Sequence, residues 1–266
     1  MEMVSASKMR RAQQRVLASR PYAERLEQMI GDLSAIQMDS DELASFPLLT
    51  QREIKRTAVI LLTPDRGLTG PLNSNLIRRA ARYITSEAGT SEVDVISVGK
   101  KGRDFMVRTK QNVIASYIGL GDKVEMADLR PVVAQAIEAF VDEKVDAVHV
   151  VYPRFVNTLT QIPEVRQILP IVQPEAGGQY TDYIFEPSPR EVLEQLLPRY
   201  VEVQVYQAML DSIASEHSAR MVAMRNASDN AKELGKELTL SLNKARQAQI
   251  TREVSEIAAG AEALKK

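Results

Sequence analysis

Apolar residues recur at helical spacing near the N-terminus. Residues 1 to about 45 are rich in Ala, Met, Gln, Arg and Glu, and apolar positions three and four residues apart predict a helix there. Those positions are Met9, Ala12, Val16, Leu26, Met29, Ile30 and Leu33. Only Pro21 interrupts the pattern, so a kink is expected there. The segment DSDELASFP is predicted to be the loop that ends this helix.

A much longer helix is predicted at the C-terminus. It begins at a Ser188 cap, and beyond Pro198 the stretch from Tyr200 onward, about 65 residues, has no proline and only two glycines. At ~1.5 Å per residue it extends roughly 100 Å, whereas a domain of ~140 residues is roughly 40 Å across. Most of this helix should therefore project beyond such a domain. The N-terminal helix is the candidate partner, and we expect the two to form an antiparallel coiled coil.

The apolar seam of the long helix is thin and rich in Met, Ala and polar residues. Its positions are His217, Met221, Met224, Ser228, Ala231, Leu234 or Gly235, Leu238, Leu242 and Ala245. A dimerisation zipper favours Leu, Ile and Val instead. The seam therefore indicates a loosely packed rod that something else surrounds or that must slide.

Between the two helices the pattern changes to strands that alternate with helices. Apolar, partly β-branched runs predict strands at 57–63, 93–99, 113–118 and 145–155, and helical spacing predicts helices at 72–87, 102–109 and 126–145. Segments 167–175 and 180–188 are predicted to be later strands that form a hairpin at one edge of the sheet.

This alternation predicts an α/β fold, because strand–helix–strand units close with right-handed crossovers into a parallel sheet. We expect a Rossmann-like, mostly parallel, doubly wound head domain over residues 57–187. The N-terminal coiled-coil helix would occupy residues 1–50 and the C-terminal coiled-coil helix residues 188–266. No internal repeat or low-complexity tract explains the helices in another way.

Composition narrows the class of protein. A hydrophobic content of 44% with 26% charged residues is typical of a soluble, core-forming chain. No run approaches ~18 consecutive apolar residues, and MEMVSASKMRRAQQ lacks the apolar core of a signal peptide, so we expect the chain to stay on the side of the membrane where it was made. The absence of cysteine excludes disulfides and cysteine zinc sites. A net charge of −1 gives no overall attraction to nucleic acid, although the first 25 residues are locally basic.

No catalytic, metal or cofactor site can be assembled from sequence motifs. Gly67 and Gly70 lie between a strand and a helix, where phosphate could bind, but Gly-x-x-Gly is not the dinucleotide fingerprint. The two histidines, His149 in a strand and His217 on the seam, are interpreted as packing residues. A nucleotide-binding α/β enzyme with helical oligomerisation arms remains the alternative, and a nucleic-acid tether is disfavoured because no aromatic residue interleaves with the arginines.

Sequence motifs at both ends carry a family resemblance. ITREVSEIAAGAEA at 250–263 resembles the pattern Ile-Thr-x-Glu-x-x-Glu-x-x-x-Gly-Ala at the C-terminus of F-type ATP synthase gamma subunits of the bacterial type. MEMVSASKMRRAQ resembles the N-terminal helix of that family, and DRGLTGPLNSN resembles its Asp-Arg-Gly-Leu-Cys-Gly loop. The resemblance covers nearly the whole chain.

The resemblance implies a central shaft that turns inside a hexamer of alpha and beta subunits. The head would sit on the membrane c-ring with the epsilon subunit, at the cytoplasmic face of the plasma membrane. The chain would have no active site or cofactor of its own, and would couple proton flow to ATP synthesis at the beta-subunit sites. Weak polar contacts suit such a shaft because they exchange readily against water.

The resemblance also implies which residues contact the surrounding subunits. Positions that match family contacts to the alpha and beta loops are Arg220, Arg246, Gln247, Thr251 and Glu253. Basic shaft residues expected to face an acidic beta-subunit loop are Lys8, Arg10, Arg11 and Arg225.

Three departures from the family pattern bear on this prediction. In the family a basic stretch ending in Ile-Thr-Lys-Ala precedes the helix that begins here at Met1, so we expect a misplaced start codon. Pro64 and Thr69 replace the usual Ser and Cys of the Asp-Arg-Gly loop, which a turn tolerates. No cysteine-bearing insertion of the chloroplast type is present, so redox control of that kind is not expected.

Overall fold

The computed structural model describes residues 1–36, 45–88, 92–172, 186 and 188–263, and the chain consists of two compact units, Met1–Val222 and Ala223–Lys266. The first unit contains a five-stranded sheet in the order β3-β2-β1-β4-β5. The strands are β1 (Arg56–Leu62), β2 (Glu92–Val98), β3 (Asn112–Tyr117), β4 (Ala147–Phe155) and β5 (Gln161–Leu169). The first four are parallel and β5 is antiparallel to β4. The predicted doubly wound, mostly parallel sheet is confirmed.

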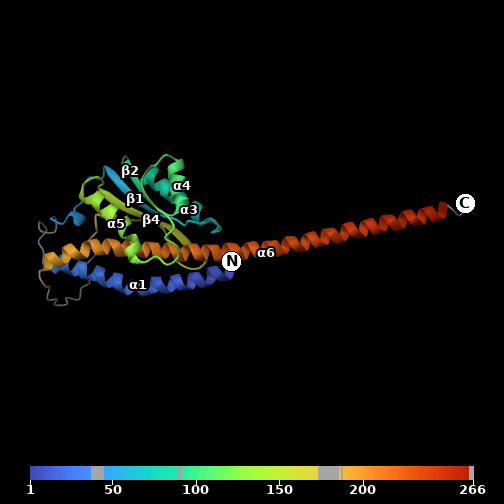
Figure 1. The fold of residues 1–266 in the computed structure, drawn as a ribbon, viewed down its shortest axis with the longest axis horizontal. Helices are drawn as coiled ribbons and strands as arrows, with labels where there is room; N and C mark the ends of the chain where they lie inside the picture. Colours follow the sequence, from blue (N-terminus) through green and yellow to red (C-terminus); the bar gives the residue numbers. More distant parts are fainter. Residues whose placement is uncertain (37–44, 89–91, 173–185, 187, 264–266) are drawn as a thin grey trace. The chain divides into compact units, whose positions relative to one another are not determined.

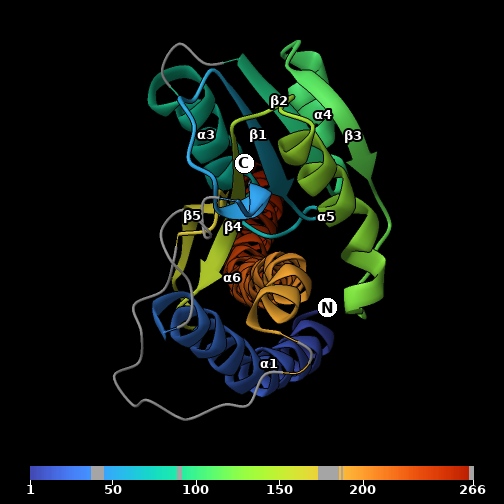
Figure 2. The same cartoon turned by 90° about the vertical axis from the view of Figure 1, so that its left-hand side faces the viewer.

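Helices cover both faces of the sheet, as Figure 2 shows. They are α3 (Leu72–Arg82), continued by the π-helical turn Tyr83–Glu87, α4 (Lys100–Arg108) and α5 (Met126–Val141). Alternate side chains of β1 point to opposite faces. Val59 and Leu61 pack in the cluster with α3 and α4, whereas Ile60 and Leu62 pack in the larger cluster with α5 and the terminal helices. A strand buried on both faces is a nearly continuous apolar run, which is why the segment TAVILL predicts a strand.

The terminal helices pack antiparallel to each other in the first unit (Figures 1 and 2). They are α1 (Glu2–Ile36) and α6 (Pro189–Ala263), which continues into the second unit. Leu26 and Ile30 of α1 share a buried cluster with Leu193 and Leu197 of α6. Pro21 lies inside α1, which stays helical through it. The antiparallel pairing predicted from the sequence is confirmed within this unit.

The second unit is a single helix with no buried side chain among its described residues. Residues 225–261 are exposed throughout except Asn243, which is partly exposed. Its large exposed apolar side chains are Leu234, Leu238, Leu240, Leu242, Ile250, Val254 and Ile257. This helix therefore carries apolar surface that its own unit leaves in contact with water.

The edge of the sheet differs from the sequence prediction. The strand beside β4 is β5 (Gln161–Leu169), so the predicted strand at 167–175 was wrong in its start and overlaps β5 only at its first three residues. The turn before β5 is closed by the Asn157 side chain, which accepts hydrogen bonds from the backbone N–H groups of Leu159 and Thr160. Because β5 is only partly buried and mixes polar with apolar residues, its sequence gave a weak strand pattern. Most of the predicted strand at 180–188 lies outside the described residues.

Candidate functional site

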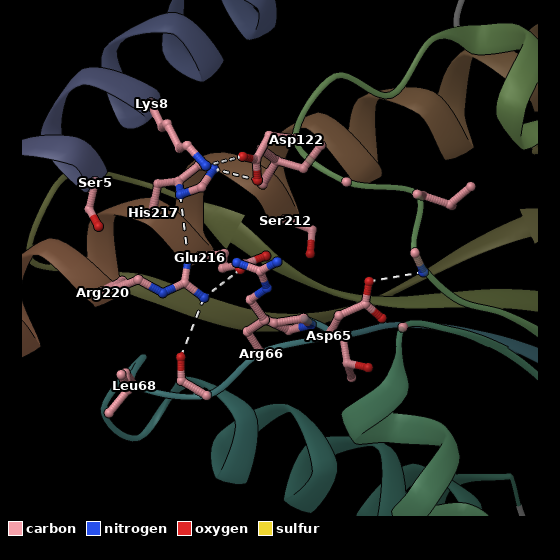
Figure 3. Close-up of a pocket in the computed structure, with 18 of the residues that line it drawn as sticks. Ser5, Lys8, Asp65, Arg66, Leu68, Asp122, Ser212, Glu216, His217 and Arg220 are labelled. Carbon is pink, nitrogen blue, oxygen red and sulfur yellow. Dashed lines mark hydrogen bonds and ion pairs between the residues drawn. The ribbon is translucent and has the colours of Figure 1, made fainter. Parts of the chain in front are cut away.

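A cavity of about 450 Å³ lies at the carboxyl edge of the parallel strands. It is lined by the loops that follow β1 and β3, by the end of β2, and by α1 and α6 (Figure 3). In doubly wound sheets this edge is the usual place for ligands, where crossovers leave in opposite directions and the loops separate. It is therefore the position at which the nucleotide-binding alternative has to be tested.

The carboxylate of Asp65, in the loop after β1, lies at the N-terminus of α4 on this edge. Its Oδ1 accepts the backbone N–H of Lys100, the first residue of α4, at 2.8 Å. Its Oδ2 accepts the backbone N–H of Gly119, after β3, at 3.0 Å. The N-terminus of a helix favours a negative charge. The protein therefore supplies its own anion here and uses it to join three loops.

Two glycines allow α4 to approach β1 closely. Gly99 has φ +100°, and a Cβ there would lie 1.8 Å from the carbonyl oxygen of Thr63. At Gly102 a Cβ would lie 2.8 Å from Oγ1 of Thr63, which accepts the Gly102 N–H. The Gly-Lys-Lys-Gly segment is thus a packing motif between helix and strand.

Charged side chains from α1, α6 and the loop after β3 meet on one side of the cavity (Figure 3). Lys8 donates to Oδ2 of Asp122, and Nε2 of His217 lies 3.0 Å from Oδ1 of the same carboxylate. Arg220 forms an ion pair with Glu216 and lies 3.5 Å from Nδ1 of His217. The cavity wall therefore contains two ion pairs, Lys8–Asp122 and Arg220–Glu216, with the His217 ring between them.

Burial and the neighbouring Lys8 set the pKa values of Asp122 and His217. Burial lowers the pKa of His217, against the opposing effect of the Asp122 charge. Partial burial pushes the pKa of Asp122 upward, but the hydrogen bond from Lys8 and the contact with His217 hold it below its ordinary value. These shifts favour an ionised Asp122 and a neutral imidazole. Nε2 approaches Asp122 to 3.0 Å without hydrogen-bond geometry, and Nδ1 can accept from Arg220.

The second histidine packs away from this cavity. Nδ1 of His149, on β4, lies 3.0 Å from the Tyr83 hydroxyl, and burial lowers the pKa of His149 to about 4. The predicted packing role fits this histidine. For His217, packing is only part of the description, because its ring also contacts charged groups.

The sequence-predicted contact residues fall into two groups. Lys8 and Arg220 both line the cavity of the first unit, and Arg10 and Arg11 are exposed on α1. The others are exposed on the helix of the second unit: Arg225, Arg246, Gln247, Thr251 and Glu253. Arg246 lies 3.3 Å from Asn243 and Glu253 accepts from Gln249 at 3.1 Å. Their role toward other subunits stays a prediction.

Sequence reasoning missed Asp65 and Asp122, although a signal was available. Both follow predicted parallel strands, and the carboxyl ends of such strands meet at one edge of the sheet. Among the described residues, no group of three or more metal-ligating side chains occurs, and no described helix is long and apolar enough to cross a membrane.

Comparison with known proteins places the chain in a family. The ATP synthase family model matches residues 1–264. The ATP synthase gamma chain of Roseiflexus castenholzii is 54% identical over 268 residues, which cover 99% of this chain and 91% of the relative. That of Chloroflexus aurantiacus is 51% identical over 267 residues, with the same two coverages, 99% and 91%.

Solved structures share the fold. A chain of the Tetrahymena thermophila mitochondrial ATP synthase, from a structure of the central stalk and c-ring, matches with a TM-score of 0.63 and 23% identity. The match covers 86% of this chain and 97% of that chain. A chain of the Euglena gracilis mitochondrial ATP synthase matches with a TM-score of 0.59 and 17% identity, over 97% of this chain and 95% of that chain. The likeness in sequence and in fold leads to one conclusion: the chain belongs to the ATP synthase gamma chain family.

Proposed function

We propose that this chain, the central-stalk rotor subunit of an ATP synthase, catalyses no reaction itself and imposes successive conformations on catalytic sites in beta subunits. The observation that carries this proposal is the exposed helix of the second unit. Leu234, Leu238 and Leu242 follow four-residue steps, so they lie along one stripe, and all three are more than half exposed. A long helix in water derives most of its stability from packing of its apolar face. A surrounding partner would provide that packing.

The predicted contact residues fit this role by their placement on the helix. Arg246 and Glu253 are seven residues apart and share one side, and Gln247 and Thr251 are four apart and share the adjacent side. We propose that these four, with Arg225, meet loops of the alpha and beta subunits. Polar contacts of this kind can be exchanged against water as the shaft turns, since each contributes only about 1 kcal/mol net.

We propose the same role for the remaining basic residues of the shaft. Arg10 and Arg11 are exposed on α1 and available to an acidic loop of a beta subunit. Lys8 and Arg220 would act next to them, although each also has a partner inside this chain. Lys8 and Arg220 should accordingly contribute less than the exposed arginines to contacts with the alpha and beta subunits.

The proposed partners are the alpha and beta hexamer, the epsilon subunit and the membrane c-ring. The related structures contain the central stalk, F1 and the c-ring, and we extend those partners to this chain because it shares their fold. We place the complex at the cytoplasmic face of the plasma membrane, with proton flow as the energy source. Residues 1–50 and 188–266 would form the shaft, and 57–187 the head.

The geometry at the sheet edge weakens the nucleotide-binding alternative. A phosphate at the N-terminus of α4 would have to displace the Asp65 carboxylate, which accepts the backbone N–H of Lys100 there and that of Gly119 after β3. Two anions do not share such a site without a counter-charge. Saturable binding of ATP by the isolated chain would favour the alternative enzyme and contradict the rotor proposal.

The test is ATP hydrolysis by a complex assembled from this chain with alpha and beta subunits. The double variant Arg246→Ala/Gln247→Ala should assemble but hydrolyse ATP about tenfold more slowly, because a charge-assisted contact of the shaft is lost. Arg252→Ala is the matched control, since Arg252 is equally exposed on the same helix but lies on a different side. Equal rates for the two variants would contradict the assigned contacts, and failure of the wild-type chain to assemble would contradict the rotor role.

A further inference from the structure

One carboxylate connects both terminal helices to the head. Asp122 lies in the loop after β3 and accepts Lys8 of α1 on one oxygen, while His217 of α6 lies 3.0 Å from the other (Figure 3). We call Lys8, Asp122 and His217 the polar lock. His217 is 2% exposed, whereas Lys8 and Asp122 are 43% and 39% exposed. The lock therefore runs from the interior of the α6 contact to the surface of α1.

The polar lock continues into the other loop at the sheet edge. Arg220, one turn after His217, donates to the carbonyl oxygen of Gly67 in the loop after β1 at 3.4 Å. The same guanidinium faces Nδ1 of His217 and is held by Glu216. Asp65 joins the loop after β1 to the loop after β3 through backbone hydrogen bonds. The two loops that contact α1 and α6 are therefore linked to each other.

The N-terminal part of α1 depends on this contact more than the rest of the helix. Across residues 1–11 the only buried side chain is that of Ser5, and no apolar side chain there is buried. Buried apolar contacts of α1 begin at Ala12 and continue at Ala23 and Leu26. The first three turns therefore lack the buried apolar packing that normally holds a helix in place, and the Lys8–Asp122 ion pair joins them to the head.

We propose that Asp122 is a positioning residue that fixes the two shaft helices to the head. Torque would then pass between shaft and head with little rotation of one relative to the other. This inference rests on the rotor function proposed above. An isolated surface ion pair would contribute little. Here the carboxylate accepts Lys8 of one helix and lies 3.0 Å from the buried Nε2 of His217 on the other, so its removal takes a contact away from each helix.

The first experiment measures hydrogen exchange on the full chain. Asp122→Ala should raise the exchange rates of the α1 amides of residues 6–11 about tenfold, because a charge-assisted contact no longer opposes local opening. His217→Ala should leave those rates unchanged, since Lys8 keeps its partner. Asp104→Ala is the matched control, because Asp104 pairs with its neighbour Arg103 on the surface of α4.

The second experiment measures how widely the angle of the head varies relative to the hexamer in the assembled complex. With a probe on the head and the hexamer fixed, the stalled rotor should show a broader angular distribution in both Asp122→Ala and His217→Ala than in Asp104→Ala. Complexes of each variant with alpha and beta subunits alone should hydrolyse ATP at the wild-type rate. This result separates the broader angular distribution from a general loss of folding. If Asp122→Ala does not fold, His217→Ala alone keeps the angular test.

The outcomes separate the two proposals. A wild-type complex that assembles and hydrolyses ATP, with Asp122→Ala and His217→Ala matching Asp104→Ala in angular distribution, overturns the polar lock and leaves the rotor role intact. A wild-type chain that neither assembles nor supports hydrolysis removes the rotor role itself. Raised exchange in α1 for Asp122→Ala only, with broader angles for both variants, supports the lock.

Discussion

Replacing Gly99 by alanine should disrupt the edge of the sheet where β2 ends. Gly99 has φ +100° and ψ 147°, a region that is almost closed to residues with a Cβ. An alanine Cβ there would lie 1.8 Å from the carbonyl oxygen of Thr63. Neither backbone can yield without cost, because the Gly99 N–H donates to Tyr117 and the Thr63 N–H donates to Val98, both at 2.8 Å.

The expected loss of stability can be worked from these contacts. The backbone conformation costs an alanine about 2 kcal/mol. Relieving the overlap requires the chain to move far enough to weaken both hydrogen bonds, at about 1 kcal/mol each. The free energy of unfolding should therefore fall by about 4 kcal/mol, a large part of the ~5–15 kcal/mol that a typical domain possesses.

Gly67→Ala is the matched control for this prediction. Gly67 lies in the neighbouring loop, and a Cβ there meets no atom within 4 Å. Alanine at such a position is neutral or stabilises by about 0.5 kcal/mol, because it restricts the unfolded chain. The two variants change the same residue type at the same edge and differ only in local geometry.

Urea unfolding followed by tyrosine fluorescence reports on the head, where Tyr83, Tyr117 and Tyr152 lie. With an m-value of ~2.5 kcal/mol/M, the Gly99→Ala midpoint should fall by about 1.7 M relative to Gly67→Ala. Equal midpoints for the two variants would refute the close approach of α4 to β1 as the reason for this glycine.

Three further predictions follow from particular contacts. Because burial lowers the pKa of His149 from 6.5 to about 4, this group binds more protons in the unfolded state, so its contribution to stability should be full above pH 6.5 and fall as the pH drops toward 4. His149→Phe should remove this contribution from unfolding titrations, and an unchanged pH dependence would contradict the assignment. Asp65→Ala should lower the free energy of unfolding by about 2 kcal/mol, because two backbone N–H groups lose their acceptor, and a urea midpoint equal to that of Asp104→Ala would count against this. Gly235→Leu should not harm folding, since a Cβ at this position meets no atom of this chain within 4 Å and leucine favours a helix by about 1 kcal/mol. In the assembled complex it should slow ATP hydrolysis, because the larger side chain would collide with the alpha and beta subunits around the helix. An unchanged rate of ATP hydrolysis would contradict this prediction.

The strands of the parallel sheet could be predicted because each carries its own signal. The strand predicted at 57–63 is β1 (Arg56–Leu62), and the strand predicted at 93–99 is β2 (Glu92–Val98). Each strand begins and ends one residue earlier than predicted. Burial on both faces makes such strands apolar throughout. The helix predicted at 72–87 includes both α3 and the π-helical turn that ends at Glu87, since helical spacing does not distinguish one from the other.

The partners of individual side chains were decided by the tertiary structure. Lys8 and Asp122 are 114 residues apart in sequence, and His217 is a further 95 along, so no local pattern could join them. The sequence therefore determined the element types, the parallel sheet and the family, because periodicity and motifs are local. The anion supplied by Asp65 and the polar lock depend on contacts between distant segments, which only the folded chain brings together.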